Sequence, residues 1–479
     1  MNNMRNRVFS MLPLALPVAL SAADAPKPAA KPNIVFILID DMGWTDVGCF
    51  GSTIYKTPNI DKLAAQGMRF TDAYAACNVC SPTRASILTG KYPARLHLTD
   101  WIPGHDNPNA KLSIPDWTMH FPLEETTLAE ALKPAGYVSA CIGKWHLGDE
   151  SYYPEKQGFD VNIGGNHKGS PNSYFSPYKN PKLTDGPNGE YLTDRLASDA
   201  ENFIKANKNK PFFLYLSNYA VHVPLQAKKE YVDQYVACGL SPKGQNSATY
   251  AAMIESVDDG VGRVMKTLDD LGIAENTVVI FMSDNGGLLK STSNAPLRAG
   301  KGTAYEGGVR EPMIVKWPGV TKPGSECSVP VISCDFFPTI LEMCNVAQPG
   351  PVDGVSLVSL LKGGSSLSRE ALFWHYPHYH TAGATPYGAV RAGDYRLIEF
   401  YEDNRLELYD LKKDIGEKTD LSKAMPDKTA QLAAMLRDWR QSVNAQMPSP
   451  NPDYDPAKAS GKGKKKGKGG EAESLQVEE

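Results

Sequence analysis

The sequence predicts an α/β fold in which a large, mostly parallel sheet is sandwiched by helices and followed by a small antiparallel sheet with one helix. Two observations predict it. From residue 33 to about residue 320, apolar runs that suit buried strands alternate with amphipathic helical patterns. Near residue 371 the pattern changes to short, closely spaced strands. A chain of 479 residues, 42% of them hydrophobic, can bury a core of this size.

The main domain is expected to contain four buried strands separated by helices. Each strand is a continuous apolar run, as is typical of parallel strands covered on both faces; they are residues 33–39, 138–142, 212–216 and 277–282. Start and stop signals such as Thr57-Pro58 and Gly272 mark the helices, which are residues 59–66, 126–133, 194–206 and 249–271.

The region after residue 371 is expected to form a separate small unit. Its strands are residues 372–376, 388–390, 395–400 and 406–410, and an amphipathic helix follows at 429–443. From Pro448 the chain is rich in Pro, Gly and Lys, which favours disorder. The predicted organisation is therefore a signal peptide at 1–23, a main domain at 24–370, a C-terminal α+β subdomain at 371–447 and a disordered tail at 448–479.

The N-terminus has the pattern of a secretory signal peptide. Arg5 and Arg7 precede the apolar residues 8–20, and the small residues 21–23 resemble a cleavage site. An uncleaved anchor is the alternative, but this run of 13 residues is short for a membrane span and no second run exists. The sequence predicts an exported protein, periplasmic or extracellular, without stable membrane insertion. A net charge of −4 gives no reason to expect a nucleic-acid partner.

Carboxylates follow two of the predicted strands. Asp40 and Asp41 come directly after the first strand, and Asp284 with Asn285 follows the fourth. Ligands of open α/β sheets bind at the carboxyl ends of the strands. Adjacent carboxylates repel one another unless a cation lies near them, and oxygen-only ligands suit Ca²⁺ or Mg²⁺. The pattern predicts a divalent cation site.

Cationic side chains are expected at the same edge. Residues 83–88 can form a helix, which would place Cys80 near a helix N-terminus that favours an anion. Two histidines, two lysines and an arginine fall just past strand ends or one helical turn from Cys80; they are Arg84, Lys144, His146, His222 and Lys301. Cations around a metal suit a tetrahedral, doubly charged transition state.

Five motifs together resemble those of the type I formylglycine sulfatases, which have the alkaline-phosphatase-like fold. They keep that family's order across residues 33 to about 320, and residues 407–411 resemble its C-terminal subdomain. The motifs are Ile39-Asp40-Asp41-Met42-Gly43, Cys80-Ser81-Pro82-Thr83-Arg84, Gly143-Lys144-Trp145-His146-Leu147-Gly148, Ser283-Asp284-Asn285-Gly286-Gly287 and residues 300–308 around Lys301.

The resemblance implies a role for each of these residues. Cys80 would be oxidised to Cα-formylglycine by a formylglycine-generating or anaerobic sulfatase-maturating enzyme, and its hydrate would attack sulfur. Arg84 and Lys144 would steady that hydrate, with Asp284 as its base. His222 and Lys301 would protonate the departing alcohol, and His146 would take a proton as sulfate leaves. One Ca²⁺ would be held by Asp40, Asp41, Asp284, Asn285 and the modified residue 80.

The substrate is expected to be a sulfated carbohydrate from a host or algal glycan. Residues 99–104 resemble a region of sulfatases from polysaccharide-degrading bacteria, which suggests sulfated galactose or N-acetylgalactosamine. Polar and aromatic residues in loops are the candidate sugar contacts: Asp100, Trp101, His105, His167, His378 and Arg391. Two alternatives stay open at this point, a phosphonate or phosphate monoester hydrolase of the same superfamily and a glycan-binding pseudoenzyme in which Cys80 is never modified.

Overall fold

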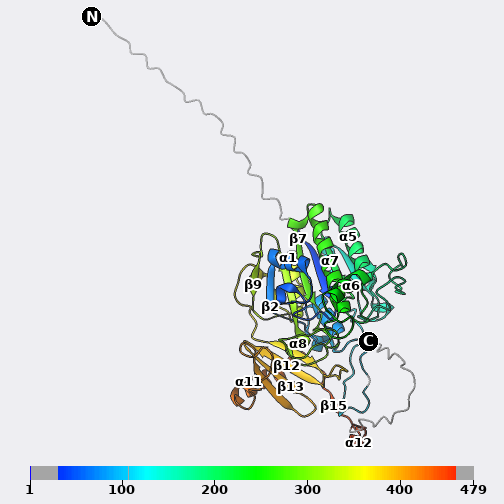
Figure 1. Ribbon diagram of the computed structural model, residues 1–479. Coiled ribbons are helices and arrows are strands. Elements are labelled where there is room, and N and C mark those ends of the chain that lie inside the picture. The colour runs from blue at the N-terminus through cyan, green and yellow to red at the C-terminus, as the bar shows by residue number, and fades with distance from the viewer. Residues whose placement is uncertain (2–30, 106, 460–479) are drawn as a thin grey trace, which may run out of the picture. The chain divides into compact units, whose positions relative to one another are not determined.

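The computed structural model describes Met1 and residues 31–105 and 107–459, and a single compact unit begins at Lys31. Its centre is a nine-stranded mixed sheet in the order β10-β2-β8-β7-β1-β6-β4-β5, with β9 also paired to β2. The strands are β1 (Asn33–Ile39), β2 (Met68–Tyr74), β4 (Val138–Gly143), β5 (Val161–Ile163), β6 (Phe212–Ser217), β7 (Thr277–Ser283), β8 (Arg310–Lys316), β9 (Ser325–Cys327) and β10 (Val331–Ile332). Figure 1 shows this sheet between layers of helices.

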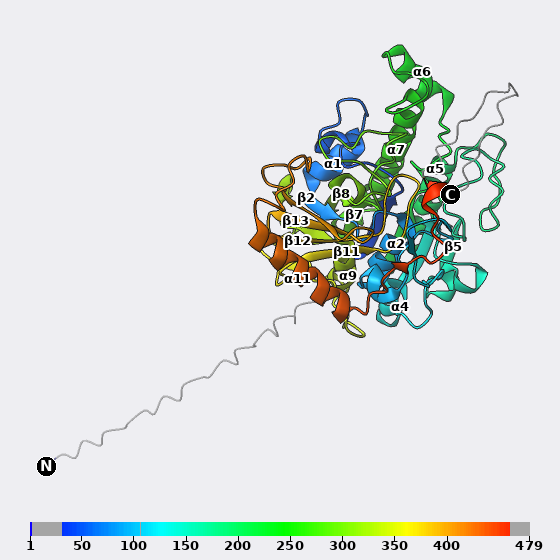
Figure 2. The same ribbon diagram turned by 90° about the horizontal axis from the view of Figure 1, so that it is seen from below.

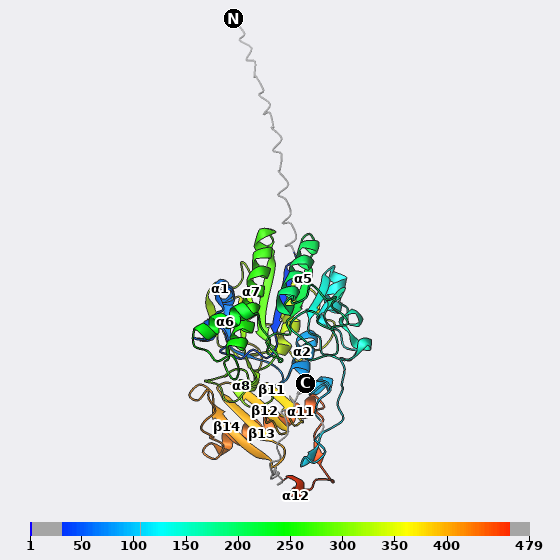
Figure 3. The same ribbon diagram turned by 45° about the vertical axis from the view of Figure 1, so that its right-hand side comes forward.

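Strand β1 shows why both faces of the sheet are covered. Successive side chains of a strand point to opposite faces. Val35, Ile37 and Ile39 belong to one core cluster with helices α1 (Pro58–Gln66), α5 (Leu192–Asn207) and α7 (Ala248–Asp270). The alternate residues, 34, 36 and 38, belong to a second cluster with α2 (Cys80–Thr89), α4 (Leu128–Leu132) and α9 (Phe336–Met343). Figure 3 shows α5 and α7 next to each other on the first face.

The predicted α/β architecture is confirmed, and the expected main-domain elements form within a few residues of their predicted ends. Two central strands were not predicted. β2 and β8 pair with each other in antiparallel fashion, and β8 is also antiparallel to β7. Charged residues such as Arg69, Asp72 and Glu311 interrupt the apolar pattern of these two strands. The structure accommodates these side chains in ionic or buried polar environments, which cannot be seen in a short stretch of sequence.

The four-stranded antiparallel sheet predicted after residue 371 is also present. It consists of β11 (Leu372–Tyr376), β12 (Tyr387–Ala392), β13 (Tyr395–Phe400) and β14 (Arg405–Asp410), in that order. Helix α11 (Pro426–Ser442) covers one face through Leu432 and Leu436, as Figure 2 shows from below. The boundary at residue 371 thus separates two sheets of one compact unit.

The other face of the small sheet is joined to the main sheet by buried polar contacts. The Trp374 indole N–H donates to the Ala75 carbonyl at 2.8 Å. Arg396 on β13 pairs with Glu417 at 2.8 Å and donates to the Ala304 carbonyl at 2.7 Å. All these side chains are fully buried, so an unpaired charge here would lie in a low-dielectric interior.

The prediction of disorder from residue 448 is wrong for its first part. β15 (Ser449–Pro450) pairs with β3 (Leu112–Ser113), and a short helix, α12 (Pro456–Ala459), follows. The Asn451 amide donates to the Pro108 and Ala110 carbonyls, so side-chain bonds to a distant loop hold a segment whose composition alone favours disorder. The predicted signal peptide and the lysine-rich residues 460–479 lie outside the described residues, apart from Met1.

The described cysteines are all unpaired, including Cys334 and Cys344. Within the described residues, no helix combines the length and the apolar character that a membrane span requires.

The buried Arg396 makes a prediction about stability. Arg396→Met leaves Glu417 without its buried cation and leaves Glu306 with Arg310 alone, so we expect the free energy of unfolding to fall by about 3–5 kcal/mol. Urea unfolding measures the change. Arg405→Met on the neighbouring strand is the matched control, because the Arg405 side chain is about half exposed and its ion pairs should contribute less than about 1 kcal/mol. Equal losses in the two variants would contradict the importance assigned to the Arg396 contacts.

Candidate active site

The carboxyl ends of four parallel strands meet at one edge of the large sheet. β6 and β7 flank β1, and β4 pairs with β6, all in parallel register. Ile39 lies opposite Ser283, and Gly143 lies opposite Ser217. The residues that follow these positions therefore project from neighbouring strand ends, and they include the predicted Asp40, Lys144 and Asp284.

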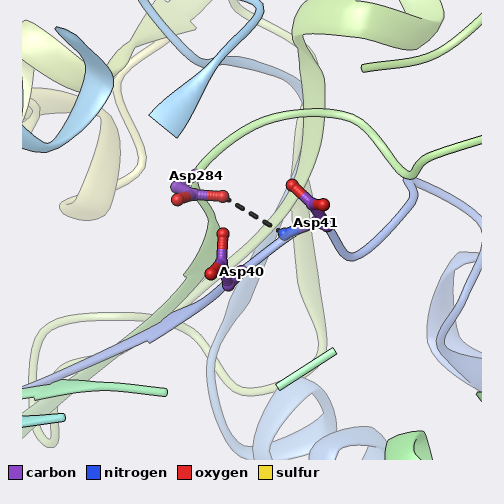
Figure 4. A group of neighbouring side chains, drawn as sticks. All are labelled: Asp40, Asp41 and Asp284. Carbon is purple, nitrogen blue, oxygen red and sulfur yellow. Dashed lines mark hydrogen bonds between the residues drawn. The ribbon is translucent and has the colours of Figure 1, made fainter. Parts of the chain in front are cut away.

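Three carboxylates are brought together there (Figure 4). One oxygen from each of Asp40, Asp41 and Asp284 lies within 4.8 Å of the others. Asp41 has a left-handed backbone conformation with φ of 61°, and its N–H donates to Asp284 Oδ1 at 3.3 Å. All three side chains are buried, so the mutual repulsion of their charges is weakly screened.

Two buried oxygens in this group have no hydrogen-bond partner among the residues that the structure describes. They are Asp40 Oδ1 and Asn285 Oδ1, while the Asn285 amide N–H₂ donates to Asp41 Oδ1 at 2.7 Å. Orphaned buried acceptors beside a carboxylate triad fit the oxygen ligands of a divalent cation. The donor set contains carboxylate and amide oxygens, which are the ligands of Ca²⁺ and Mg²⁺ rather than of softer metals.

Three cationic side chains partly compensate the carboxylates. Lys144 Nζ contacts Asp40 at 2.7 Å, Lys301 Nζ contacts Asp41 at 3.1 Å, and Arg84 donates to Asp284 through Nε at 3.0 Å and a terminal nitrogen at 2.7 Å. Burial alone would raise the pKa of Asp40, but Lys144 and the neighbouring cations hold it below its usual range. Burial and the charge of Asp40 raise the pKa of Asp284 to about 6.

Cys80 is the first residue of helix α2, as the sequence predicted from the helical pattern after it. It is buried, and its Sγ lies 3.2 Å from Nδ1 of His146. Burial, and then the charge of Lys144, lowers the pKa of His146 well below its ordinary value, so this imidazole is neutral. A helix N-terminus and nearby cations together favour an anionic group at residue 80.

A second histidine lies on the other side of the carboxylates. His222 Nδ1 lies 2.8 Å from the Val223 carbonyl, which can only accept, so Nδ1 carries a proton. Its Nε2 lies 3.1 Å from Lys301 Nζ and 3.6 Å from Asp41 Oδ2. Lys301 Nζ is thus within hydrogen-bonding distance of His222 Nε2.

The predicted sugar contacts occupy several different environments. Asp100 is buried and accepts from the Tyr376 hydroxyl at 2.7 Å, and His378 is buried against Thr99 at 2.8 Å. Trp101 is also buried, and the centroid of its ring lies 6.4 Å from that of His146. Its indole N–H donates to His105 Nδ1 at 3.2 Å.

The remaining predicted sugar contacts differ in their exposure. His105 is partly exposed and His167 is exposed. Arg391 pairs instead with Asp72 at 2.7 Å and contacts Tyr74, which commits it to the ion network between the two sheets.

Three further residues, to none of which the sequence assigned a role of its own, also lie in this region. The Ser217 hydroxyl accepts from Arg84, and Ser81 contacts both the His146 carbonyl and the loop at Ile102. His380 lies against Gly302, beside Lys301, and packs edge-on against His105 at 5.2 Å between ring centroids. Ser217 ends a predicted strand and Ser81 lies inside a quoted motif, but a lone serine carries no distinctive signal.

Comparison with known families identifies the family of this chain. A family model described as sulfatase matches residues 32–346, and one for the C-terminal region of N-sulphoglucosamine sulphohydrolase matches residues 300–445. The chain belongs to the sulfatase family. This sulfatase is therefore a sulfuric ester hydrolase, and the resemblance stated from its motifs is confirmed.

Individual relatives agree with this assignment over most of the chain. A sulfatase of Formosa agariphila is 35% identical and covers 87% of this chain and 90% of its own. The N-acetylgalactosamine-6-sulfatase of Canis lupus familiaris is 36% identical, and the match covers 74% of this chain and 70% of that protein. The crystal structure of Ps i-CgsB in complex with k-i-k-neocarrahexaose superposes with a TM-score of 0.74 at 31% identity, covering 90% of this chain and 96% of that one.

The orphaned oxygens predict a cation-dependent stability. A cation that binds only the folded sulfatase adds about 2.7 kcal/mol to the free energy of unfolding at roughly 100 times its dissociation constant. Thermal unfolding with increasing Ca²⁺, after chelation, should therefore show a rising midpoint. Asp40→Asn should suppress that rise. Asp403→Asn, at an exposed turn, should leave it intact. A midpoint that is independent of cation in the native sequence would contradict the site.

Proposed function

We propose that this sulfatase is exported and removes sulfate from a carbohydrate, using residue 80 as Cα-formylglycine and one Ca²⁺. The observation that carries the proposal is the position of Cys80. It starts helix α2, it is buried, and its Sγ lies 3.2 Å from a neutral histidine and beside Lys144 and Lys301. Burial raises the pKa of the Cys80 thiol, which makes it a poor nucleophile in its unmodified form.

Oxidation of residue 80 supplies what a thiol at this position lacks. The hydrated aldehyde has two hydroxyl groups, one to attack sulfur and one to expel sulfate by re-forming the carbonyl. The attack on sulfur is helped by the cations at the N-terminus of α2, which stabilise an attacking oxyanion. The expulsion of sulfate is helped by His146, whose Nδ1 faces residue 80 and has an unshared electron pair that can accept the proton of the second hydroxyl. No separate attack of water on sulfur is required.

Ca²⁺ is the cation that the ligand set favours. Asp40, Asp41, Asp284 and Asn285 would hold it with residue 80, so nearly every ligand comes from the protein. Ca²⁺ accepts such crowded and irregular oxygen sets, whereas Mg²⁺ keeps several waters and demands near-octahedral geometry. When bound, the cation polarises the sulfate oxygens and offsets the carboxylate charge.

The protein's own groups account for the remaining proton movements. Arg84 and Lys144 are each fixed by a carboxylate, and they orient the group at residue 80. Asp284 Oδ1 accepts a long bond of 3.3 Å from the Asp41 N–H, which leaves it available as a base for the attacking hydroxyl. On the leaving side, Lys301 donates toward His222, and this pair supplies the proton that the departing alcohol oxygen takes as its bond to sulfur breaks.

Sulfated galactose or N-acetylgalactosamine is the proposed substrate. The names of two comparison proteins support this class, one an N-acetylgalactosamine-6-sulfatase and the other bound to a neocarrahexaose. Among the predicted sugar contacts, His105 and His167 have accessible side chains, while Asp100 is buried and accepts from the Trp101 backbone N–H. An apolar leader after Arg5 and Arg7 supports export to the compartment where such glycans are met.

Replacement of residue 80 tests the proposal. Cys80→Ala should lower turnover of a sulfated galactose or N-acetylgalactosamine by more than about 10³-fold, because the nucleophile is lost. Cys77→Ala, at a buried cysteine three residues earlier, is the matched control and should keep most of the activity. Peptide mass spectrometry should find an aldehyde in place of the thiol at residue 80 of the matured protein.

Three outcomes would contradict the proposal. An active preparation whose residue 80 is an unmodified thiol would exclude formylglycine. Faster turnover of an aryl phosphate than of the matching aryl sulfate would favour the phosphate or phosphonate monoester hydrolase. A matured protein that binds sulfated sugars without hydrolysing them would be a glycan-binding pseudoenzyme.

Replacement of the accessible His105 should weaken the binding of a sulfated sugar. His105→Ala should raise KM for a sulfated sugar about tenfold, the loss expected for one or two hydrogen bonds, while KM for a small aryl sulfate stays unchanged. Steady-state kinetics with both substrates measures the difference. His120→Ala is the control, because it removes an imidazole that stacks on Tyr152 instead. An equal change with both substrates would remove His105 from the sugar site.

A further inference from the structure

Ser81, the residue after Cys80, links three separate segments around His146. Its hydroxyl donates to the His146 carbonyl at 2.9 Å and accepts from the Ile102 N–H at 3.2 Å. Ser81 is completely buried, so water does not substitute for either bond. The hydroxyl thus acts as both a donor and an acceptor within the protein.

The same loop also contacts the imidazole ring. His146 Nε2 lies 2.5 Å from the Ile102 carbonyl, which can only accept, so Nε2 carries the proton of the neutral ring. Nδ1 then has its lone pair directed at residue 80, with Cys80 Sγ 3.2 Å away. The Ile102 carbonyl therefore selects the tautomer that can accept a proton from the group at residue 80.

The backbone of His146 needs external support to hold this geometry. Its φ is 58°, in the left-handed region that non-glycine residues rarely occupy. The Asn166 carbonyl accepts from its N–H at 3.0 Å, and Ser81 donates to its carbonyl. The ring also packs on Gly169, where a Cβ would approach His146 Cε1 to 2.5 Å. Backbone and ring are thus held at separate points.

We propose that Ser81 is a positioning residue for His146: its hydroxyl ties the Ile102 loop to the His146 backbone, so that Nδ1 faces residue 80 in the proton-accepting tautomer. The significance of this arrangement for turnover rests on the proposed function, in which His146 takes the proton of the second hydroxyl as sulfate leaves residue 80. The tautomer itself does not depend on that function and can be observed separately.

Loss of the Ser81 hydroxyl should therefore slow sulfate release and spare sulfate transfer. For a substrate whose transfer to residue 80 is irreversible, kcat/KM includes steps only up to that transfer, whereas kcat also includes release. Ser81→Ala should lower kcat by about 10²-fold, the effect of displacing a general base, with a parallel fall in KM and nearly constant kcat/KM. A merely destabilised protein would lose active molecules with KM unchanged.

The kinetic test uses the matured, full-length protein and an activated aryl sulfate. Peptide mass spectrometry first establishes that Ser81→Ala is oxidised at residue 80 to the same extent as the native sequence. During turnover by Ser81→Ala, a burst of phenol should then appear, and mass spectrometry should find an added sulfuryl group on residue 80. Ser86→Ala is the matched control, because it removes a buried hydroxyl from the same helix that bonds Thr83 and Ser333 instead. This control should show neither effect.

A second measurement needs no catalysis and works on the protein with Cys80 unmodified. The chain contains only nine histidines, so ¹⁵N-histidine labelling should allow the two ring nitrogens of His146 to be assigned with the help of His146→Gln. The native sequence should show a protonated Nε2 and an unprotonated Nδ1. Ser81→Ala should shift this pair toward an average of both tautomers, and Gly169→Ala, which crowds the ring directly, should perturb it in the same way.

The outcomes separate this inference from the proposed function. A native sulfatase that is inactive after maturation would overturn the function and leave the tautomer to be judged by NMR. An active native enzyme with Ser81→Ala kinetics and ring-nitrogen shifts like the native ones would overturn the role of Ser81. If Ser81→Ala fails to fold, Gly169→Ala decides the matter for His146 itself. A perturbed ring-nitrogen spectrum with an unaffected kcat would contradict the requirement for a fixed ring.

Discussion

Three carboxylates and three cationic side chains are buried together at the carboxyl edge of the large sheet, and each requires the others to be there. Asp40 is matched by Lys144, Asp41 by Lys301 and Asp284 by Arg84. A single buried ion without its partner would cost several kcal/mol. The pairing is nevertheless incomplete, since Asp40 Oδ1 and Asn285 Oδ1 accept no hydrogen bond. That residual demand for positive charge makes the cluster suited to a cation and an anionic substrate rather than to a purely structural role.

The remaining architecture serves to bring these charges into one place. Parallel strands β1, β4, β6 and β7 deliver Asp40, Lys144, His222 and Asp284 to the same edge, and α2 presents Cys80 with its N-terminal N–H groups. The segment around Lys301 is held from outside the main sheet. Arg396 on β13 donates to the Ala304 carbonyl, and Ala384 donates to the Gly302 carbonyl at 3.0 Å. The small sheet therefore contributes to the site by holding the segment around Lys301 through these hydrogen bonds.

Much of this arrangement could be predicted from the sequence, because the signals were local. Apolar runs ending in Asp40-Asp41 and Asp284-Asn285 predicted both the strands and the meeting of their ends. Strands β2 and β8 escaped prediction because Asp72, Arg310 and Glu311 break their pattern, and two of these side chains form an ion pair across the strands. The roles of Ser81, Ser217 and Arg396 depend on partners between 21 and 133 residues away, which no local pattern contains.

The account predicts a cation inside the carboxylate group of the matured protein, and a crystal structure of that protein grown with Ca²⁺ tests this most directly. The predicted result is one ion with anomalous signal about 2.3–2.6 Å from Asp40 Oδ1 and Asn285 Oδ1, with residue 80 as an aldehyde or its hydrate beside it. The contrary result is an empty triad in which Lys144, Lys301 and Arg84 alone compensate the carboxylates and residue 80 remains a thiol. That result would make the charge cluster a structural feature of the fold.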